Sequence, residues 1–327
     1  MEHRLGIVVP AFKERFLART LNSIASQTDQ RFNLYVFDDH SPAPIETLAR
    51  SARLKQLNYH RFDENLGSKS LARNWNRCVQ QVEEPWVWLF SDDDIMEPAC
   101  VQRFYAALDS SAPKTAVYRF NTVIIDAEDR PIRLNPPHPP FESWMQFAYF
   151  LLSGSRQSTA QEAIFSKQAW ERQGGFVDFP LAWGSDHANT IALGAERGIA
   201  TLEGPRVRFR QSGENISSRR AGKDLEPKLE ATQLFVSWLL EFSKAHPDPE
   251  FCLGPQALRE VTRQWFFSHL EACHALYGPK LAMKLSRFAS RTWGGPLWLN
   301  FGRVTKTHAG SLAHFCRTKL KGRSATG

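Results

Sequence analysis

The sequence predicts an α/β fold in which a mostly parallel sheet is flanked by helices and followed by a helical C-terminal extension. In the first third of the chain, short apolar strands alternate with amphipathic helical segments, which is typical of parallel sheets covered on both faces. From about residue 224 onward, apolar residues recur at helical spacing. With 327 residues the chain can bury one large domain plus an appendage. We therefore expect an α/β domain at residues 1–222 and a basic helical region at residues 223–327.

Four apolar segments are the expected strands of the N-terminal half. They cover residues 4–10, 32–37, 57–62 and 86–90. Between them, apolar residues spaced three or four apart predict helices, as at Leu17, Leu21 and Ile24. The fourth segment consists of large apolar residues only, as expected for a strand buried on both faces.

The middle of the chain predicts further strands and helices, and the C-terminal part predicts helices. We expect strands at residues 115–126, 163–165 and 207–211, and helices at residues 98–108, 144–152, 229–242, 258–276 and 279–290. One more helix should begin by residue 187 and run through residue 193.

Acidic residues follow two of the N-terminal strands. Asp38 and Asp39 follow the second strand, and Asp92, Asp93 and Asp94 follow the fourth. The carboxyl ends of parallel strands meet at one edge of the sheet, where open α/β sheets bind ligands. Three adjacent carboxylates repel one another, and a cation with hard oxygen ligands relieves that repulsion. The alternative is a solvated acidic turn that caps the next helix.

Composition excludes several classes of protein. Hydrophobic residues make up 42% of the chain and charged residues 23%, as in ordinary globular proteins. No run approaches the roughly 18 uncharged apolar residues of a spanning helix, and the first residues lack a signal-peptide pattern. The five cysteines are widely spaced without a CxxC pair, which favours free thiols in a reducing compartment. We therefore expect a cytoplasmic protein.

Positive charge is concentrated at the C-terminus. From Ala272 onward there are ten basic residues and no acidic one, whereas the whole chain carries +7. Lys280, Lys284, Arg287 and Arg291 fall on one helical face, which suits an anionic membrane surface. Aromatic residues that could accompany that contact are Trp293, Trp298 and Phe301. They form no stacking platform, so we expect no nucleic acid partner; the remaining alternative is a merely solvated face.

Six short motifs lie in a specific order between residues 5 and 217. They are Val8-Val9-Pro10-Ala11-Phe12 with Glu14, Val36-Phe37-Asp38-Asp39-His40-Ser41, Asn65-Leu66-Gly67 with Ala72-Arg73-Asn74, Ser91-Asp92-Asp93-Asp94, Gly174-Gly175-Phe176 with Ser185-Asp186, and Ser212-Gly213-Glu214-Asn215-Ile216-Ser217. Each motif alone is weak. In this order they resemble the family 2 glycosyltransferases, which implies the Rossmann-like GT-A fold.

The resemblance implies a site for a nucleotide-diphosphate sugar donor. Phe12 is expected to stack on the base, Asp39 to accept hydrogen bonds from base or ribose, and Arg73 to approach base or phosphate. The alternatives are a core position for Phe12 and a solvated helix charge for Arg73. The donor-binding residues expected from the resemblance are Pro10, Ala11, Phe12, Glu14, Asp38, Asp39, Arg73 and Asp92.

The resemblance also places Mn²⁺ or Mg²⁺ between the acid cluster and the diphosphate. Asp93 and Asp94 are the expected ligands, with Asp93 as the main one. The family usually has Asp-x-Asp-Asp, whereas this chain has Ser91 at the first acidic place, and Asp92 is the alternative for that role. A cation there would stabilise the negative charge that grows on the leaving diphosphate. Ahead of the Ser-rich stretch at residue 212, many relatives have a histidine ligand, whereas this chain has Arg210-Gln211.

Asp186 is the general base that the resemblance implies. An acceptor hydroxyl becomes a good nucleophile when a carboxylate removes its proton in the transition state. A single displacement of this kind inverts the anomeric centre of the sugar. The alternative for Asp186 is a helix N-cap, for which aspartate is a favoured residue.

These expectations describe a metal-dependent, inverting glycosyltransferase. It would move a sugar from the donor to a hydroxyl of a glycan or lipid-linked acceptor, in cell-surface polysaccharide synthesis at the inner membrane face. One alternative is a nucleotidyltransferase, which usually has a glycine-rich phosphate loop that the segment after the first strand lacks. The other is a non-catalytic sugar-nucleotide-binding protein, which metal-dependent turnover of a donor would reject.

Overall fold

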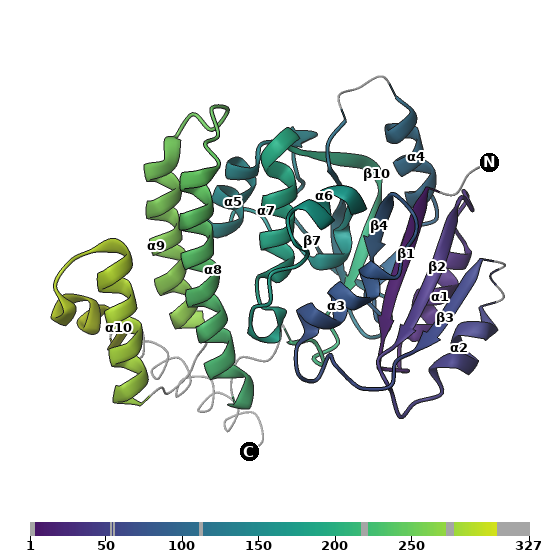
Figure 1. The fold of residues 1–327 in the computed structure, drawn as a ribbon, viewed down its shortest axis with the longest axis horizontal. Coiled ribbons are helices and arrows are strands. Elements are labelled where there is room, and N and C mark those ends of the chain that lie inside the picture. The colour runs from purple at the N-terminus through teal and green to yellow at the C-terminus, as the bar shows by residue number, and fades with distance from the viewer. Residues whose placement is uncertain are drawn as a thin grey trace, which may run out of the picture.

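In a computed structural model, the chain folds around a ten-stranded sheet that is flanked by helices (Figure 1). The structure describes residues 4–52, 54, 56–110, 114–216, 222–272 and 278–305. The predicted α/β fold and its C-terminal helices are confirmed. In these ranges, no helix is both long enough and apolar enough to cross a membrane.

The N-terminal half alternates strands and helices as predicted. Its elements are β1 (Leu5–Ala11), α1 (Leu17–Ala25), β2 (Phe32–Asp38), α2 (Ile45–Ser51), β3 (Leu57–Arg61), α3 (Leu71–Gln80) and β4 (Trp86–Leu89). Helix α3 has a local start signal, because the Ser70 hydroxyl accepts a hydrogen bond from the N–H of Arg73.

The middle of the chain adds strands and helices to this half. They are β5 (Ile95–Met96), α4 (Cys100–Asp109), β6 (Val117–Ile125), β7 (Pro131–Leu134), β8 (Phe141–Glu142), α5 (Trp144–Leu152), the 3₁₀ helix η1 (Ala160–Glu162), β9 (Ala163–Ser166), α6 (Lys167–Arg172), the 3₁₀ helix η2 (Pro180–Ala182), α7 (Ser185–Arg197) and β10 (Ile199–Arg210). Strand β10 begins well before the predicted residue 207. Its pairing with β6 breaks at an irregularity between Leu202 and Arg206 and then resumes.

The sheet has the order β3-β2-β1-β4-β9-β6-β10-β5, and β7 and β8 pair with β6 and β10. Strands β3, β2, β1 and β4 run parallel to one another. Beyond β4 the sheet is mixed, because β9 runs antiparallel to both β4 and β6, whereas β10 is parallel to β6. The parallel half therefore places several strand ends at one edge of the sheet.

Alternating side chains of the sheet feed two hydrophobic cores. Along β1, Val8 belongs to the core shared with α3, α5 and α7, whereas Ile7 and Val9 belong to the core shared with α1 and α4. The sheet is thus buried on both faces, as the all-apolar strand β4 predicts.

The C-terminal region consists of the 3₁₀ turn η4 (Gly222–Asp224) and the helices α8 (Leu225–Ala245), α9 (Gly254–Ala272) and α10 (Pro279–Trp293). Figure 1 shows α8 and α9 standing between the sheet domain and α10. Phe235 of α8 and Leu258 of α9 share the core of α5 and α7. On their other side, α8 and α9 pack against α10 through residues such as Val236, Phe266 and Leu285.

Candidate active site

The carboxyl ends of β1, β2 and β4 meet at one edge of the sheet. Ala11 of β1 is in register with Asp38 of β2, and Val8 is in register with Leu89 of β4. The N–H of Phe90 continues this pairing by donating to the Val8 carbonyl at 2.7 Å. The loops that follow these three strands therefore lie side by side.

Residues 91–94, called the acid turn here, follow β4, and Asp92 joins this turn to the loop after β1. Its Oδ2 accepts hydrogen bonds from the backbone N–H groups of Phe12 and Lys13, at 3.1 and 3.0 Å. Burial raises the pKa of Asp92, although these donors and the Lys13 charge oppose the shift. Asp92 thus fixes the position of Phe12 relative to the other two acids.

Asp93 is the acid with a cation and an amide at its carboxylate. It is 6% exposed. Its Oδ2 lies 3.8 Å from Nζ of Lys13 and accepts a hydrogen bond from Nδ2 of Asn215 at 3.3 Å. Burial, and then the neighbouring Asp92 charge, raise the pKa of Asp93 to about 6. A positive charge brought to this carboxylate would favour its ionised form.

Asp94 lies deeper and is fully buried. Its Oδ1 accepts a hydrogen bond from the backbone N–H of Arg210 at 2.6 Å. Its Oδ2 is buried and has no hydrogen-bond partner within the described part of the chain. Burial, and then the charge of Asp93, raise the pKa of Asp94 well above its usual range.

Arg210 is a buried cation beneath the acid turn. Its Nε donates to the Asp93 carbonyl at 2.6 Å, and its Nη1 donates to the Asp126 carbonyl at 2.8 Å. Nη1 also lies 2.5 Å from Oδ1 of Asp129, and the guanidinium stands 4.4 Å from the ring centre of Phe16. The side chain therefore joins the acid turn to the end of β6.

Two carboxylates of the acid turn, those of Asp93 and Asp94, are the groups that could hold a divalent cation here. Across the described ranges, no three His, Cys, Asp or Glu side chains are grouped to hold a metal. Mg²⁺ at phosphate sites commonly takes one or two carboxylates and completes its shell with phosphate oxygens and water. The raised pKa of Asp93 and the unpartnered Oδ2 of Asp94 are two features that a cation would relieve.

Asp38 is buried and bonded within the protein. Its Oδ1 accepts from the Ser41 N–H at 2.7 Å, and its Oδ2 accepts from the Tyr59 hydroxyl at 2.8 Å and from Arg61. Burial, and then the bond to Asp38, raise the pKa of Tyr59 to about 12. Because the Arg61 side chain is 42% exposed, it is a positive group that Asp38 holds at the surface.

Asp39 is likewise buried, and it organises the turn before α3. It accepts hydrogen bonds from the N–H groups of Leu66 and Gly67, both at 2.9 Å, and pairs with Arg77. A Cβ at Gly67 would lie 2.4 Å from Oδ2 of Asp39, so a side chain there cannot be accommodated without movement. Burial raises the pKa of Asp39 although all three partners oppose it.

Phe12, Glu14 and Arg73 are exposed at this edge, whereas Ala11 is buried and Pro10 is half-buried. Phe12 is 39% exposed, which excludes a core position for its ring. Its carbonyl accepts a hydrogen bond from the Ser41 hydroxyl at 2.6 Å. The ring is therefore held on a fixed loop and is free to stack on a ligand.

Asp186 lies in the first turn of α7 and is half-buried. The N-cap position belongs to Gly184, at a φ of 89°, and no side chain caps the helix. Asp186 is therefore not the N-cap that the alternative required. Its Oδ2 lies 3.8 Å from Nε2 of His187, which in turn lies 3.4 Å from the carbonyl oxygen of Ser158.

A series of contacts connects the start of α7, which carries Asp186, with the acid turn. Asn215 bonds Asp93, and the carbonyl of the next residue, Ile216, accepts a hydrogen bond from Lys228 of α8 at 2.5 Å. The Lys228 ammonium stands 4.4 Å from the ring centre of Trp183, three residues before Asp186. Helix α8 thus contacts both the segment before Asp186 and the segment that bonds Asp93.

Several of these residues are not evident from the sequence. Lys13, Arg61 and Lys228 are not among the site residues expected from the motifs. An isolated lysine or arginine gives no sequence signal of its own. For Lys13 alone a signal existed, because it directly follows Phe12 in the loop after β1. Lys228 is buried in the middle of an ordinary helical pattern, which predicts no contact with Ile216.

Comparisons with known proteins concern the family and the fold of the chain. Residues 6–167 match the model of the family described as Glycosyl transferase family 2. No curated protein sequence matches the chain.

Solved structures share the fold over nearly the whole chain. The chain is similar to residues 1–349 of TarS from S. aureus in complex with UDP, with a TM-score of 0.64 and 13% sequence identity. The same part of TarS in complex with UDP-GlcNAc gives a TM-score of 0.63, also at 13% identity. In both comparisons the match covers 97% of this chain and 92% of that chain. At this identity, the similarity shows a shared fold that includes the C-terminal helices.

Proposed function

Because this chain belongs to glycosyl transferase family 2 through residues 6–167, we propose that it transfers a sugar from a nucleotide-diphosphate sugar to a hydroxyl group. The single observation that carries this proposal is the meeting of the acid turn, the Phe12 loop and the end of β2 at one sheet edge. The GT-A arrangement of sheet and helices supplies that edge. The complexes of TarS with UDP and UDP-GlcNAc make uridine diphosphate sugars the first donors to test.

In this proposal, the Phe12 ring stacks on the base of the donor. Arg61, Arg73 and Lys13 supply positive charge around the nucleotide. Asp38 binds the side chain of Arg61, and Asp39 fixes the turn before the helix that carries Arg73. The exposed ring and the fixed backbone of the Phe12 loop support this role, because stacking needs an accessible and well-positioned face.

Asp93 and Asp94 would hold Mn²⁺ or Mg²⁺ against the diphosphate, with Asp93 as the main ligand. Asp92 would fix the acid turn, since its Oδ2 already accepts two backbone N–H groups. Arg210 is itself a cation and would support the turn through the bond from its Nε to the Asp93 carbonyl. The ion would supply charge stabilisation for the leaving nucleoside diphosphate. Lys13, 3.8 Å from Asp93, adds a protein cation on the same side.

Asp186 would act as the general base. As the acceptor oxygen attacks the anomeric carbon, its proton passes to the Asp186 carboxylate, and the bond from that carbon to the diphosphate oxygen breaks. The product has the inverted configuration, and the nucleoside diphosphate leaves with the bonding electrons. Being half-buried, Asp186 is accessible to an acceptor hydroxyl.

Three further parts of the proposal concern the setting of the reaction. Residues 1–222 would be the donor-binding and catalytic domain, and residues 223–327 a helical region on the acceptor side. The acceptor would be a glycan or lipid-linked molecule of cell-surface polysaccharide synthesis. The protein would be cytoplasmic and would contact the inner membrane face through its basic C-terminal region, which carries ten basic residues after Ala272.

A donor screen tests the proposed function. Nucleotide-diphosphate sugars would be compared by thermal unfolding with and without Mn²⁺, since a ligand of the native state raises stability by mass action. The expected result is a rise in Tm for one donor, larger with Mn²⁺, followed by release of nucleoside diphosphate on addition of a hydroxyl acceptor. Binding without any release across the screen would instead favour a non-catalytic protein, and release of pyrophosphate from a nucleoside triphosphate would favour a nucleotidyltransferase.

A further inference from the structure

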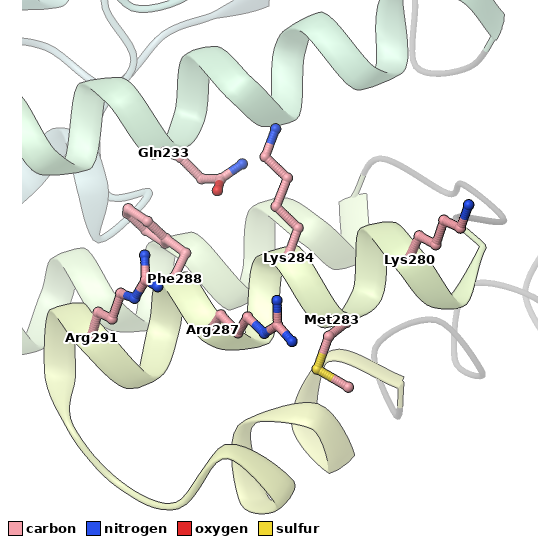
Figure 2. A pocket seen from close by; sticks show the side chains of 7 residues that line it. All are labelled: Gln233, Lys280, Met283, Lys284, Arg287, Phe288 and Arg291. Atoms are coloured by element: carbon pink, nitrogen blue, oxygen red, sulfur yellow. The ribbon is translucent and has the colours of Figure 1, made fainter.

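A hollow of about 350 Å³ lies between α8 and α10 (Figure 2). Its lining includes Gln233 of α8 and, from α10, Lys280, Lys284, Arg287, Phe288 and Arg291. In Figure 2, Gln233 and Lys284 extend toward one another from the two helices, and Phe288 lies beside them. The hollow therefore combines positive charge with an amide and one aromatic face.

The face of α10 that lines this hollow is strongly positive. Lys280, Lys284, Arg287 and Arg291 are exposed, and α10 contains no acidic residue. Among the residues that the structure describes, none of these four forms an ion pair with a carboxylate. The neighbouring helix differs, because Arg263 of α9 pairs with Glu260 at 2.7 Å. Four like charges on one helix face favour an external anion.

An exposed apolar turn adjoins the C-terminal end of α10. Residues 297–305 are helical, and Nδ2 of Asn300 donates to Oγ of Ser290 at 2.9 Å and to the Gly294 carbonyl at 3.2 Å. These bonds hold the turn beside the last residues of α10. Trp298 at its tip is 73% exposed, and the flanking leucines, Leu297 and Leu299, are 38% and 39% exposed.

The other aromatic residues of this region have a different role from the one expected. Trp293 and Phe301 pack against the core formed by α8, α9 and α10. Of the three aromatic residues expected to contact a membrane, only Trp298 is therefore available for that contact. Tryptophan is favoured at the membrane interface because its ring is apolar and its N–H is polar.

We propose that the end of the molecule formed by α10 and residues 297–299 docks on a bilayer of anionic lipids, with headgroup phosphates in the hollow between α8 and α10. This inference rests on the proposed peripheral membrane contact and gives it a site. Arginine and lysine bind phosphate oxygens by charge-assisted hydrogen bonds, and Gln233 adds an amide at the same place. Leu297, Trp298 and Leu299 enter the interface and add the apolar contribution that a charged helix alone lacks.

Vesicle co-sedimentation of the full-length protein tests this inference. The variant is the triple change Lys284→Gln, Arg287→Gln and Arg291→Gln, which keeps good helix formers on an exposed face. Each basic residue near an anionic surface contributes about fivefold to partitioning, so the triple variant should bind phosphatidylglycerol vesicles about 100-fold less tightly. Phosphatidylcholine vesicles should bind neither protein.

A matched control removes the same charge elsewhere. The triple change Arg50→Gln, Arg103→Gln and Arg197→Gln likewise removes three exposed positive charges, and this variant should bind vesicles as the wild type does. A second variant, Trp298→Ser, should weaken vesicle binding about tenfold without changing its salt dependence, because it removes apolar contact and no charge. Inorganic phosphate at millimolar concentration should compete weakly, since it offers one group where the bilayer offers many.

The inference is overturned if the α10 triple variant binds phosphatidylglycerol vesicles as tightly as the wild-type protein does. A second result would also overturn the inference. If the α10 triple variant bound vesicles normally but no longer transferred sugar to an anionic glycan, the hollow would bind the acceptor and not the bilayer. Donor binding, measured by thermal unfolding in the absence of vesicles, should be the same in all variants. The failure of the membrane site can therefore be distinguished from a failure of the proposed transferase activity.

Discussion

The backbone N–H of Arg210 donates to Oδ1 of Asp94 over 2.6 Å, and the Arg210 side chain bonds the carbonyl of Asp93. One residue of β10 thus holds two of the three acids. Asp94 and Arg210 are 116 residues apart in the sequence, and both are fully buried. The acid turn is therefore built by tertiary structure as much as by its own sequence.

We predict that Arg210→Met destabilises the fold by about 3 kcal/mol, because removing one member of a buried charged network leaves its partners unpaired. The matched control is Arg208→Met on the same strand, whose side chain is 38% exposed and pairs with Glu97. That exposed pair should contribute less than about 1 kcal/mol. Urea unfolding measures both variants, and equal losses would show that the buried network has no special role.

Asp93 gives a pH-dependent prediction. Its pKa in the folded protein, about 6, lies above the ordinary value of 3.8, so between these values the folded protein binds a proton that the unfolded chain releases. Stability without metal therefore falls as pH rises through this window and stays low above it. Asp93→Asn removes the effect and should raise the free energy of unfolding at pH 7.5 by on the order of 2–3 kcal/mol.

The gain should shrink as pH falls through this window and disappear near about pH 3, where the carboxyl is protonated in both states. Adding Mn²⁺ should stabilise the wild type more than the Asp93→Asn protein. The control, Asp63→Asn at an exposed position, changes the net charge equally and should shift stability by less than about 0.5 kcal/mol at both pH values. Destabilisation by Asp93→Asn at pH 7.5 would contradict the electrostatic account of the acid turn.

Gly67→Ala tests the tight turn that Asp39 organises. The added Cβ would meet Oδ2 of Asp39 at 2.4 Å, and Asp39 cannot move without breaking its bonds to Leu66 and Arg77. We expect a loss of about 1–3 kcal/mol in thermal unfolding experiments. Gly302→Ala is the control, since nothing lies within 4 Å of its added Cβ, and that change should be neutral or slightly stabilising.

Phe12→Ala should weaken donor binding by about 1–3 kcal/mol, the usual contribution of stacking an aromatic ring on a base. Because Phe12 is 39% exposed, its removal should change stability little. Phe150→Ala, at an equally exposed phenylalanine, should leave donor affinity unchanged. Isothermal titration with the donor identified by the screen measures both, and unchanged affinity in Phe12→Ala would remove the ring from the site.

The succession of strands along the N-terminal half of the chain and the position of the acids after them were predictable from the sequence. Buried parallel strands such as β1 and β4 are continuous apolar runs, so their ends, and with them Asp92–Asp94, can be located from composition alone. The short strands β5 and β8 have two residues each, too few to show a period. The first part of β10 was missed because Glu203-Gly204-Pro205 is typical of a turn.

The division of roles among the acids could not be read from the sequence. Asp38 and Asp39 were expected to face the donor, and their contacts to Tyr59, Arg61 and Arg77 depend on how β2, β3 and α3 pack. Likewise, Asp92, Asp93 and Asp94 are adjacent, yet one bonds the Phe12 loop, one meets Lys13 and one meets Arg210. Adjacent residues point in different directions, and only tertiary structure shows what each direction meets.

The most direct test of the transferase mechanism is a single-turnover measurement on Asp186→Asn with the identified donor and acceptor. The amide keeps the size of the carboxylate but cannot accept the proton of the acceptor hydroxyl. We predict donor affinity within a factor of about three of wild type and a transfer rate lowered by 10²-fold or more, as is typical for loss of a general base. Transfer at the wild-type rate would contradict the assignment of Asp186 as the base.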